Sequence, residues 1–496
     1  MGKKVLAFDF GASGGRAVMG EYNGEKLSLT ELHRFSNDPV MLGGTFYWDF
    51  LRLFHDIKLG ISKAVISGNK DIISLGIDTW GVDFGLLDND GRLLENPVHY
   101  RDERTVGMQE EVFKSIPKNE LYDKTGIQFQ NFNTVFQLYY LASKRKDLLE
   151  RAQTMLLMPD LFNYFLTGNK ATEYSIASTG QLLNPYTGDW ERSIISSLGL
   201  PERIFTNIVD PGTKVGTLLP SICEELGALP CAVYAVSGHD TAAAVAAVPV
   251  KKGENYAYLS CGTWSLLGLE TEKPIINEKT FTLNYTNEGG YGRKIRFLKN
   301  IIGLWLMQEC RRQWQREGDS MSFADIDKLT IKAKSLERFI NPDYAAFSVP
   351  GNMPARIAEY CRKTGQTPPQ NKGEVARCIT ESLALKYRSI IEELENIRRR
   401  KIDVIHIIGG GVQDKLLCQY TANSTKKKVL AGPIEATALG NVAVQLISCG
   451  EFANIDEARD VIAASFPPQI YEPQDTAHWE EAYLKYLSII KKESLT

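Results

Sequence analysis

The segment VLAFDFGASGGRAVMGE (residues 5–21) decides the fold, because an apolar strand ends in a turn of small residues and a second apolar strand follows. A later segment, YAYLSCGTWSLLGLE (residues 256–270), repeats this pattern. Recurrence at about half the length of a 496-residue chain predicts two similar domains that face each other. We expect the boundary within PVKKGENY (residues 249–256), which gives an N-terminal domain of residues 1–248 and a C-terminal domain of residues 249–496.

Short apolar runs alternate with longer amphipathic segments along the chain, for example IISLGID (72–78), AVYAVSG (232–238) and VIHIIGG (404–410). Strands that alternate with helices are typical of α/β proteins. Apolar residues make up 43% and charged residues 24% of the sequence, which is ordinary globular composition. We therefore expect an α/β fold, with residues 477–493 forming a C-terminal helical tail. This tail could meet a partner subunit, although packing on its own domain is the commoner outcome.

Charge and cysteine usage exclude several classes of partner. The formal net charge is −3, and the one dense basic run, residues 398–401, follows a helical stretch, where positive charge favours a helix C-terminus. Nucleic acid and membrane partners are therefore not expected. The eight cysteines contain no Cys-x-x-Cys pair, and no apolar run is long enough for a signal peptide or a membrane span. These features favour reduced thiols and a cytoplasmic location.

The first turn, Gly11 to Arg16, consists of small residues that allow a ligand to approach the backbone closely. Its N–H groups could hold the phosphates of a nucleotide. A plain β-hairpin turn is an equally good interpretation of this segment alone. Asp9, which closes the strand, is either an ordinary strand-end carboxylate or a partner of hydrated Mg²⁺.

Trp80, Gly81 and Asp83 follow an apolar strand directly, at the position where open α/β sheets bind ligands. A Trp ring can cover a sugar face, and an Asp can accept hydrogen bonds from sugar hydroxyls. A core Trp beside a turn is the commoner outcome for an isolated Trp of this kind.

Asp240 lies where the apolar strand of residues 232–236 gives way to an Ala-rich helix. It could cap that helix or act as the base that accepts a proton in phosphoryl transfer, and the two roles are compatible. His239, beside it, is expected to be a hydrogen-bonding neighbour. Farther on, Gly409, Gly410 and Gly411 would let a flat ligand such as adenine lie against the backbone, and no Rossmann or P-loop fingerprint occurs in the proper context.

Taken in order, these segments resemble the FGGY carbohydrate kinases, within the actin and hexokinase-like ATPases, over nearly the whole chain. The similarity is closest to the branch of the family that acts on L-rhamnulose. Eleven segments carry it: DFGASGGR (9–16), GIDTWGVDFGLLD (76–88), YRDERT (100–105), GIQFQNFNT (126–134), LLMPDLFNYFLTG (156–168), SGHDTAAAV (237–245), LSCGTWSLLG (259–268), TNEGG (286–290), LKNIIGLWLMQE (298–309), HIIGGGVQ (406–413) and AGPIEATALGN (431–441).

The resemblance implies two actin/hexokinase-like (ribonuclease H-like) domains facing an interdomain cleft, with sugar bound mainly by the first and ATP mainly by the second. Asp240 would be the catalytic base. The resemblance places sugar contacts at Gly81, His239, Asp240, Thr241 and Asn300, to which the reasoning above adds Trp80 and Asp83. It places ATP contacts at Ala12, Ser13, Gly14, Gly15, Arg16, Thr263, Gln308 and Gly410. Ser260 replaces Asp9 in the second turn, so any carboxylate contribution to Mg²⁺ would come from Asp9, through water.

The implied activity is transfer of the γ-phosphoryl group of ATP, with Mg²⁺, to the 1-hydroxyl of L-rhamnulose in L-rhamnose catabolism. The same chemistry on L-fuculose, L-ribulose or D-xylulose is the nearest alternative. A more distant alternative is a non-catalytic, sugar-sensing actin-like protein. The presence of Asp240 argues against it, since a sensor needs no base. The oligomeric state does not follow from the sequence.

Overall fold

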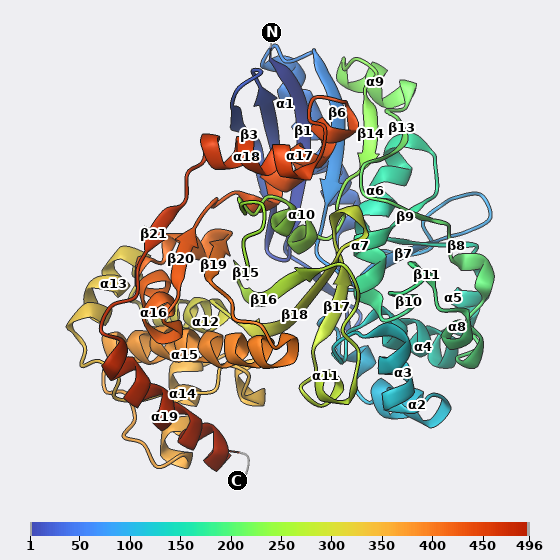
Figure 1. The fold of residues 1–496 in the computed structure, drawn as a ribbon. Helices are drawn as coiled ribbons and strands as arrows, with labels where there is room; N and C mark the ends of the chain where they lie inside the picture. Colours follow the sequence, from blue (N-terminus) through green and yellow to red (C-terminus); the bar gives the residue numbers. More distant parts are fainter. Residues whose placement is uncertain (1, 494–496) are drawn as a thin grey trace. The chain divides into compact units, whose positions relative to one another are not determined.

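The computed structural model describes residues 2–493 (Figure 1), and these form two compact units. Unit 1 contains residues 2–249 together with two later segments, 270–298 and 436–466. Unit 2 contains residues 250–269, 299–435 and 467–493. The predicted boundary after residue 248 divides the sequence into continuous domains and stays a prediction.

Unit 1 is built on a six-stranded mixed sheet in the order β13-β14-β6-β1-β2-β3. β1 pairs in parallel with β6, and β6 with β14, while β2 and β3 continue from β1 in antiparallel fashion. The strands are β1 (Lys3–Gly11), β2 (Gly14–Tyr22), β3 (Leu27–Ser36), β6 (Ile72–Asp78), β13 (Thr213–Thr217) and β14 (Ala232–Ala235).

Helices cover both faces of this sheet. Alternate residues of β1, including Leu6 and Phe8, pack into one hydrophobic core with α1 (Phe50–Ile66) and α6 (Met158–Thr167). The opposite face contacts α17 (Ala436–Ser448), which packs in turn on α10 (Asp240–Ala246). Asp9 lies on this second face, in register with Asp78, because successive side chains of a strand point to opposite sides.

The remaining part of unit 1 forms a second core around residues 84–205. It includes α2 (Met108–Ser115), α3 (Lys118–Thr125), α4 (Thr134–Lys144), α5 (Lys146–Arg151), α7 (Tyr174–Ala177), α8 (Arg192–Ser197) and the strand pair β7 (Phe84–Leu87) and β8 (Thr154–Leu157). Elsewhere in unit 1 lie α9 (Pro220–Leu226), α11 (Glu278–Thr282), α18 (Ile455–Ser465) and β17 (Thr286–Gly289), which pairs with the first half of β18 (Ile295–Ile302).

Unit 2 repeats the central strand order of unit 1. Its strands β18-β16-β15-β19-β20 correspond to β3-β2-β1-β6-β14, and β21 adds an antiparallel edge. The hairpin of β15 (Tyr256–Cys261) and β16 (Trp264–Thr271) is followed by the parallel strands β19 (Val404–Ile408) and β20 (Lys428–Ala431), with β21 (Gln469–Tyr471) outside them. The predicted two-domain α/β fold is confirmed.

The helices of unit 2 are α12 (Trp305–Arg316), α13 (Phe323–Lys332), α14 (Met353–Lys363), α15 (Lys372–Arg398), α16 (Lys415–Thr425) and α19 (Thr476–Glu493). Asn371 precedes α15 as its N-cap, and its side chain accepts from the backbone N–H of Glu374; the helix ends at Arg398, the first residue of the basic run. α19, the C-terminal helix, contacts α15 and α16 within unit 2.

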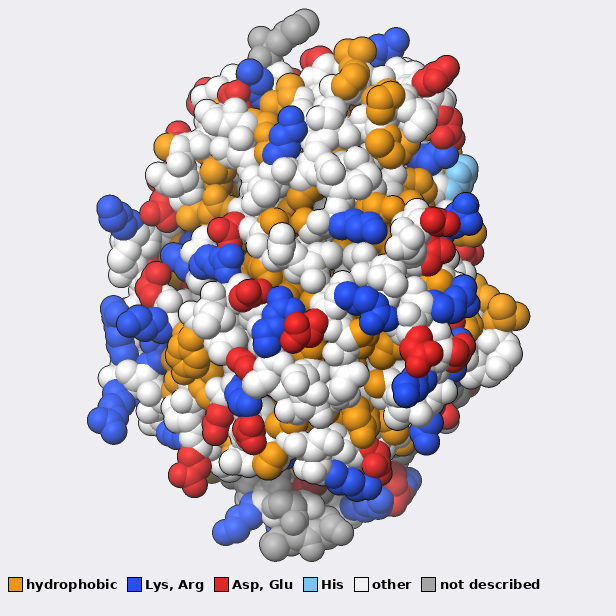
Figure 2. Space-filling model, turned by 90° about the vertical axis from the view of Figure 1, so that its right-hand side faces the viewer, with side chains coloured by type: hydrophobic (Ala, Val, Ile, Leu, Met, Phe, Trp, Pro, Cys, Tyr) orange, Lys and Arg blue, Asp and Glu red, His pale blue; other side chains and the backbone are white. Residues whose placement is uncertain are grey.

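On the face drawn in Figure 2, acidic and basic side chains are interspersed and hydrophobic side chains lie in small groups between them. Among the described residues, no helix combines the length and the apolar character that a membrane span requires.

Candidate active site

Three carboxyl groups lie at the carboxyl ends of neighbouring strands in unit 1. Asp9 and Asp78 are paired residues of β1 and β6, and Asp240 opens α10 just after β14. The backbone N–H of Asp240 donates to Thr79 O at 2.8 Å, which fixes α10 to the end of β6. Burial first, and then the charge of Asp9, raises the pKa of Asp78 well above its usual range. The end of this sheet is therefore a concentrated acidic site.

Asp240 is held in place without being sealed from solvent. Its side chain is 28% exposed, and Oδ1 accepts hydrogen bonds from Thr241 N at 2.6 Å and Thr241 Oγ1 at 3.1 Å. Burial raises its pKa, the charge of Asp9 adds to that shift, and the hydrogen bonds from Thr241 oppose it. The N-cap position of α10 belongs to His239, so the carboxylate of Asp240 is not the cap of this helix.

His239 contacts Asp240 and two residues that the sequence reasoning missed. Its Nε2 lies 3.3 Å from Asp240 Oδ1, and its Nδ1 lies 2.9 Å from Arg296 Nη2 and 3.4 Å from Glu288 Oε2. Glu288 belongs to the TNEGG segment, whereas Arg296, on β18, lies outside all eleven segments. Nothing in their local sequence distinguishes them from ordinary strand residues.

The first turn is the tip of the β1–β2 hairpin, with Gly11 and Gly14 as its last paired residues. Ala12 and the exposed Ser13 form the tip, and Asn37 Nδ2 donates to Gly11 O at 3.0 Å. Gly15 is required by packing, since a Cβ there would lie 2.4 Å from the Phe35 ring. The hairpin interpretation is correct, and it is compatible with a phosphate-binding role for the tip.

Arg16 and Asp9 form an ion pair beside this turn. Asp9 Oδ2 accepts from Arg16 Nε at 3.1 Å and from Nη2 at 2.8 Å. The Arg16 side chain is 18% exposed, so its guanidinium is fixed at the turn by Asp9. An anion that reaches the turn would meet a preorganised cation as well as backbone N–H groups.

The second turn, in unit 2, gathers the other predicted ATP residues. Thr263 lies between β15 and β16, and its Oγ1 donates to Gln308 Oε1 at 3.3 Å. Gly409 has a φ of +82°, which favours glycine, and the following Gly410 faces open space. A Cβ at Gly411 would lie 2.3 Å from Cys261 Sγ, so the glycine segment packs against the end of β15. Thr263, Gln308 and Gly410 thus surround one hairpin tip.

Trp80 and Asp83 lie in the protein interior. Asp83 is 1% exposed, and its Oδ2 accepts from Trp48 Nε1 at 2.7 Å, from Trp80 Nε1 at 3.0 Å and from Tyr100 N at 3.1 Å. Burial raises its pKa to about 6 although these hydrogen bonds lower it. The Trp80 ring packs on Trp48, with centroids 4.1 Å apart.

These contacts favour the core interpretation of Trp80, and we do not retain Trp80 and Asp83 as direct sugar contacts. The carboxylate of Asp83 already accepts four hydrogen bonds, the fourth from Gln137 Nε2 to Oδ1 at 3.0 Å, so it holds the turn in place from the interior. Gly81 is the partly exposed residue of that turn, and a Cβ there would lie 3.2 Å from Thr179. Asn300 lies on the part of β18 that belongs to unit 2, and its role as a sugar contact stays a prediction.

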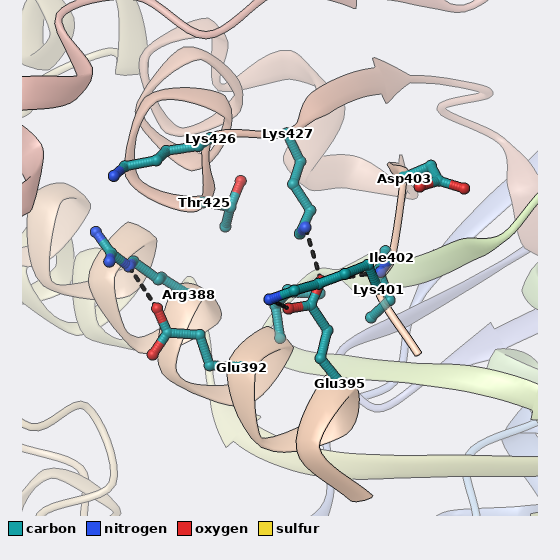
Figure 3. A pocket seen from close by; sticks show the side chains of 10 residues that line it. Arg388, Glu392, Glu395, Lys401, Ile402, Asp403, Thr425, Lys426 and Lys427 are labelled. Atoms are coloured by element: carbon teal, nitrogen blue, oxygen red, sulfur yellow. Dashed lines mark hydrogen bonds and ion pairs between the residues drawn. The ribbon is translucent and has the colours of Figure 1, made fainter. Parts of the chain in front are cut away.

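A pocket of about 450 Å³ lies in unit 2 where α15 and α16 end (Figure 3). Its charged groups neutralise one another: Arg388 binds Glu392 and Glu480, while Glu395 accepts from Lys401 and Lys427. None of the predicted site residues lines this pocket. Lys401, the last residue of the basic run at the end of α15, is therefore part of a local ion-pair network.

Sequence models of one family match both halves of the chain. The N-terminal domain of the FGGY family of carbohydrate kinases matches residues 4–247, and its C-terminal domain matches residues 257–449. The chain belongs to the FGGY family of carbohydrate kinases. It is accordingly an enzyme, a phosphotransferase that uses ATP and a sugar.

Similar proteins agree with membership of this FGGY family. The chain is 46% identical to a rhamnulokinase of Bacteroides thetaiotaomicron, over 99% of this chain and 100% of the relative. It is 40% identical to a rhamnulokinase of Bacillus subtilis, over 95% of each chain.

Solved structures match the fold at low sequence identity. Gluconate kinase from Lactobacillus acidophilus has a TM-score of 0.79 at 15% identity, covering 99% of this chain and 98% of that one. Glycerol kinase from Plasmodium falciparum with ADP has a TM-score of 0.79 at 14% identity, with the same coverage. At this identity the likeness concerns the fold alone.

The acidic end of the unit 1 sheet in this FGGY kinase suits a hydrated divalent cation that arrives with nucleotide. Within residues 2–493, no three His, Cys, Asp or Glu side chains lie close enough to form a preformed metal cage. Mg²⁺ typically keeps several waters and uses one or two carboxylates plus substrate phosphates. Asp78 Oδ1 is buried without a hydrogen-bond partner among these residues, and the repulsion between Asp9 and Asp78 would be relieved by a cation. The donor set therefore fits a water-mediated site.

Proposed function

We propose that this kinase transfers the γ-phosphoryl group of ATP to the 1-hydroxyl of L-rhamnulose, giving L-rhamnulose 1-phosphate and ADP in the breakdown of L-rhamnose. The observation that carries the choice of sugar is the set of six relatives named rhamnulokinase, which are 38–46% identical to this chain over nearly its whole length. We also propose a cytoplasmic location, in keeping with eight unpaired cysteines.

Asp240 would accept the proton of the sugar 1-hydroxyl as O1 forms a bond to the γ-phosphorus and the bond to the β,γ-bridging oxygen breaks. Because the transition state of phosphoryl transfer is loose, the carboxylate orients the hydroxyl and takes its proton late. Its raised pKa makes it a better acceptor than an ordinary Asp. Thr241, Gly81 and Asn300 would hold the remaining sugar hydroxyls, and His239, whose ring nitrogens lie beside Arg296 and Asp240, would line the sugar site.

The two hairpin tips would bind ATP. In unit 1, Ala12, Ser13, Gly14 and Gly15 would supply backbone N–H groups and Arg16 a fixed positive charge. In unit 2, Thr263, Gln308 and Gly410 would bind the rest of the nucleotide. Mg²⁺, when bound with ATP, neutralises charge on the phosphates, and Asp9 would contact its hydration shell.

A panel of ketoses tests the sugar assignment. With ATP and Mg²⁺, we expect ADP release with L-rhamnulose at a kcat/KM at least about tenfold above that with L-fuculose, L-ribulose or D-xylulose, because a sugar hydroxyl left without its buried partner costs binding energy. A higher kcat/KM for L-fuculose than for L-rhamnulose would leave the assignment as a sugar kinase unchanged but would make L-fuculose the substrate. Sugar binding without turnover of any ketose would instead favour a sensor.

A further inference from the structure

Arg296 is a fully buried arginine that touches the residue next to the proposed base. It lies on the unit 1 part of β18, with 0% of its side chain exposed. Its Nε donates to Gly289 O at 2.8 Å, and its Nη2 lies 3.0 Å from Glu288 Oε2 and 2.9 Å from His239 Nδ1. Nη1 is buried without a hydrogen-bond partner among residues 2–493.

These buried polar contacts add little to the stability of the fold, so a purely structural role does not explain them. A buried ion pair is often no more stable than apolar residues of the same volume, and an unmade hydrogen bond of a buried charged group costs more still. Burial raises the pKa of Glu288, but the charge of Arg296 opposes it and the pKa ends below its ordinary value. Glu288 thus remains an anion that anchors Arg296 against His239.

The contact to Arg296 decides which nitrogen of His239 carries the proton. A guanidinium can only donate, so His239 Nδ1 must accept, and the neutral ring then carries its proton on Nε2. Nε2 is the atom that faces Asp240 Oδ1, at 3.3 Å. The protonated nitrogen of His239 is therefore the one that lies beside the carboxylate of Asp240.

We infer that Arg296 is a positioning residue for phosphoryl transfer, which holds His239 in the Nε2–H tautomer so that it orients the carboxylate of Asp240. The inference rests on the proposed role of Asp240 as the base. Glu288 completes the chain of contacts by holding the guanidinium. Without Arg296, Nδ1 would face only Glu288 at 3.4 Å, and because a carboxylate accepts, the ring would favour the proton on Nδ1 and leave Nε2 bare beside Asp240.

The first test replaces Arg296 by a residue of similar length without charge. Arg296→Met is expected to lower kcat for sugar phosphorylation about 100-fold, with the KM for MgATP unchanged, since a misplaced catalytic group costs about that much. Arg388→Met is the matched control, because Arg388 is also buried, binds two carboxylates and has an unpartnered Nη1. A wild-type kcat in Arg296→Met would overturn the inference, as would an equal loss in both variants.

The second test needs no stable variant at position 296. Long-range ¹H–¹⁵N spectra of wild-type protein labelled in its six histidines report the tautomer of each ring, and His239→Gln identifies the signal of His239. We expect a bare Nδ1 and a protonated Nε2 for His239. An Nδ1–H tautomer or an imidazolium at neutral pH contradicts the inference. Asp240→Asn separates the role of Asp240 as base from the role of Arg296. If Asp240→Asn is active, Asp240 is not the base. If Asp240→Asn is inactive while Arg296→Met is fully active, only the role of Arg296 is removed.

Discussion

Asp240→Asn is expected to lower kcat on the order of 10³-fold while leaving the affinities for sugar and MgATP within a small factor of wild type. The amide has nearly the same shape as the carboxylate, and its oxygen can still accept from Thr241 N at the start of α10. What it loses is the ability to take the proton of the 1-hydroxyl. Steady-state kinetics together with calorimetric titration of sugar binding would separate these two quantities.

Asp56→Asn provides the matched control for Asp240→Asn. Asp56 is a buried carboxylate of α1 in the same unit, and its Oδ1 lies 2.8 Å from Nε2 of a histidine, His33, much as Asp240 neighbours His239. It is not among the predicted site residues, so its amide variant should lose stability and keep kcat. Near-wild-type turnover in Asp240→Asn would remove Asp240 from its role.

Gly440→Ala is expected to give the largest loss of stability from a single methyl group, about 3 kcal/mol. Gly440 is where α17 crosses α10, and a Cβ there would lie 1.7 Å from the backbone oxygen of Ala243. Backbone cannot move aside as a flexible side chain can, so the helices must separate. Because α10 begins with Asp240, the variant should lose kcat as well as melting temperature.

Thermal unfolding by circular dichroism, with kcat measured below the transition, checks this expectation. Thr437→Ala, on the same helix and only half-buried, is the control and should leave both quantities nearly unchanged. A melting temperature of Gly440→Ala within a degree of wild type would mean that α10 and α17 do not pack as closely as described.

Local chemistry explains what the sequence predicts well. The residues around Gly11 and Gly262 carry strand, turn and strand signals within a few positions, and both form hairpins followed by a parallel strand in the same order. Asp240 has a local signal of the same kind, since a strand end, a small residue and an Ala-rich helix adjoin it in the sequence, and its role stays a prediction. Signals of this kind need no knowledge of distant contacts.

Contacts between distant residues explain what sequence reasoning missed. Arg296 meets His239 across 57 positions, and Asn441 Nδ2 meets Asp78 Oδ2 at 2.6 Å across 363, so neither pairing has a local signal. Trp80 had two interpretations because an isolated Trp beside a strand end is compatible with either a sugar face or a core. The position of Trp48, which only the folded chain brings to it, favours the core.

Identification of the phosphorylated product tests the central claim most directly. Purified protein would be incubated with ATP, Mg²⁺ and L-rhamnulose, and the product examined by ³¹P–¹H correlation NMR. We predict a single phosphate coupled to the protons of C1, formed in step with ADP. A phosphate on another carbon, or ADP released without any phosphorylated sugar, would contradict it.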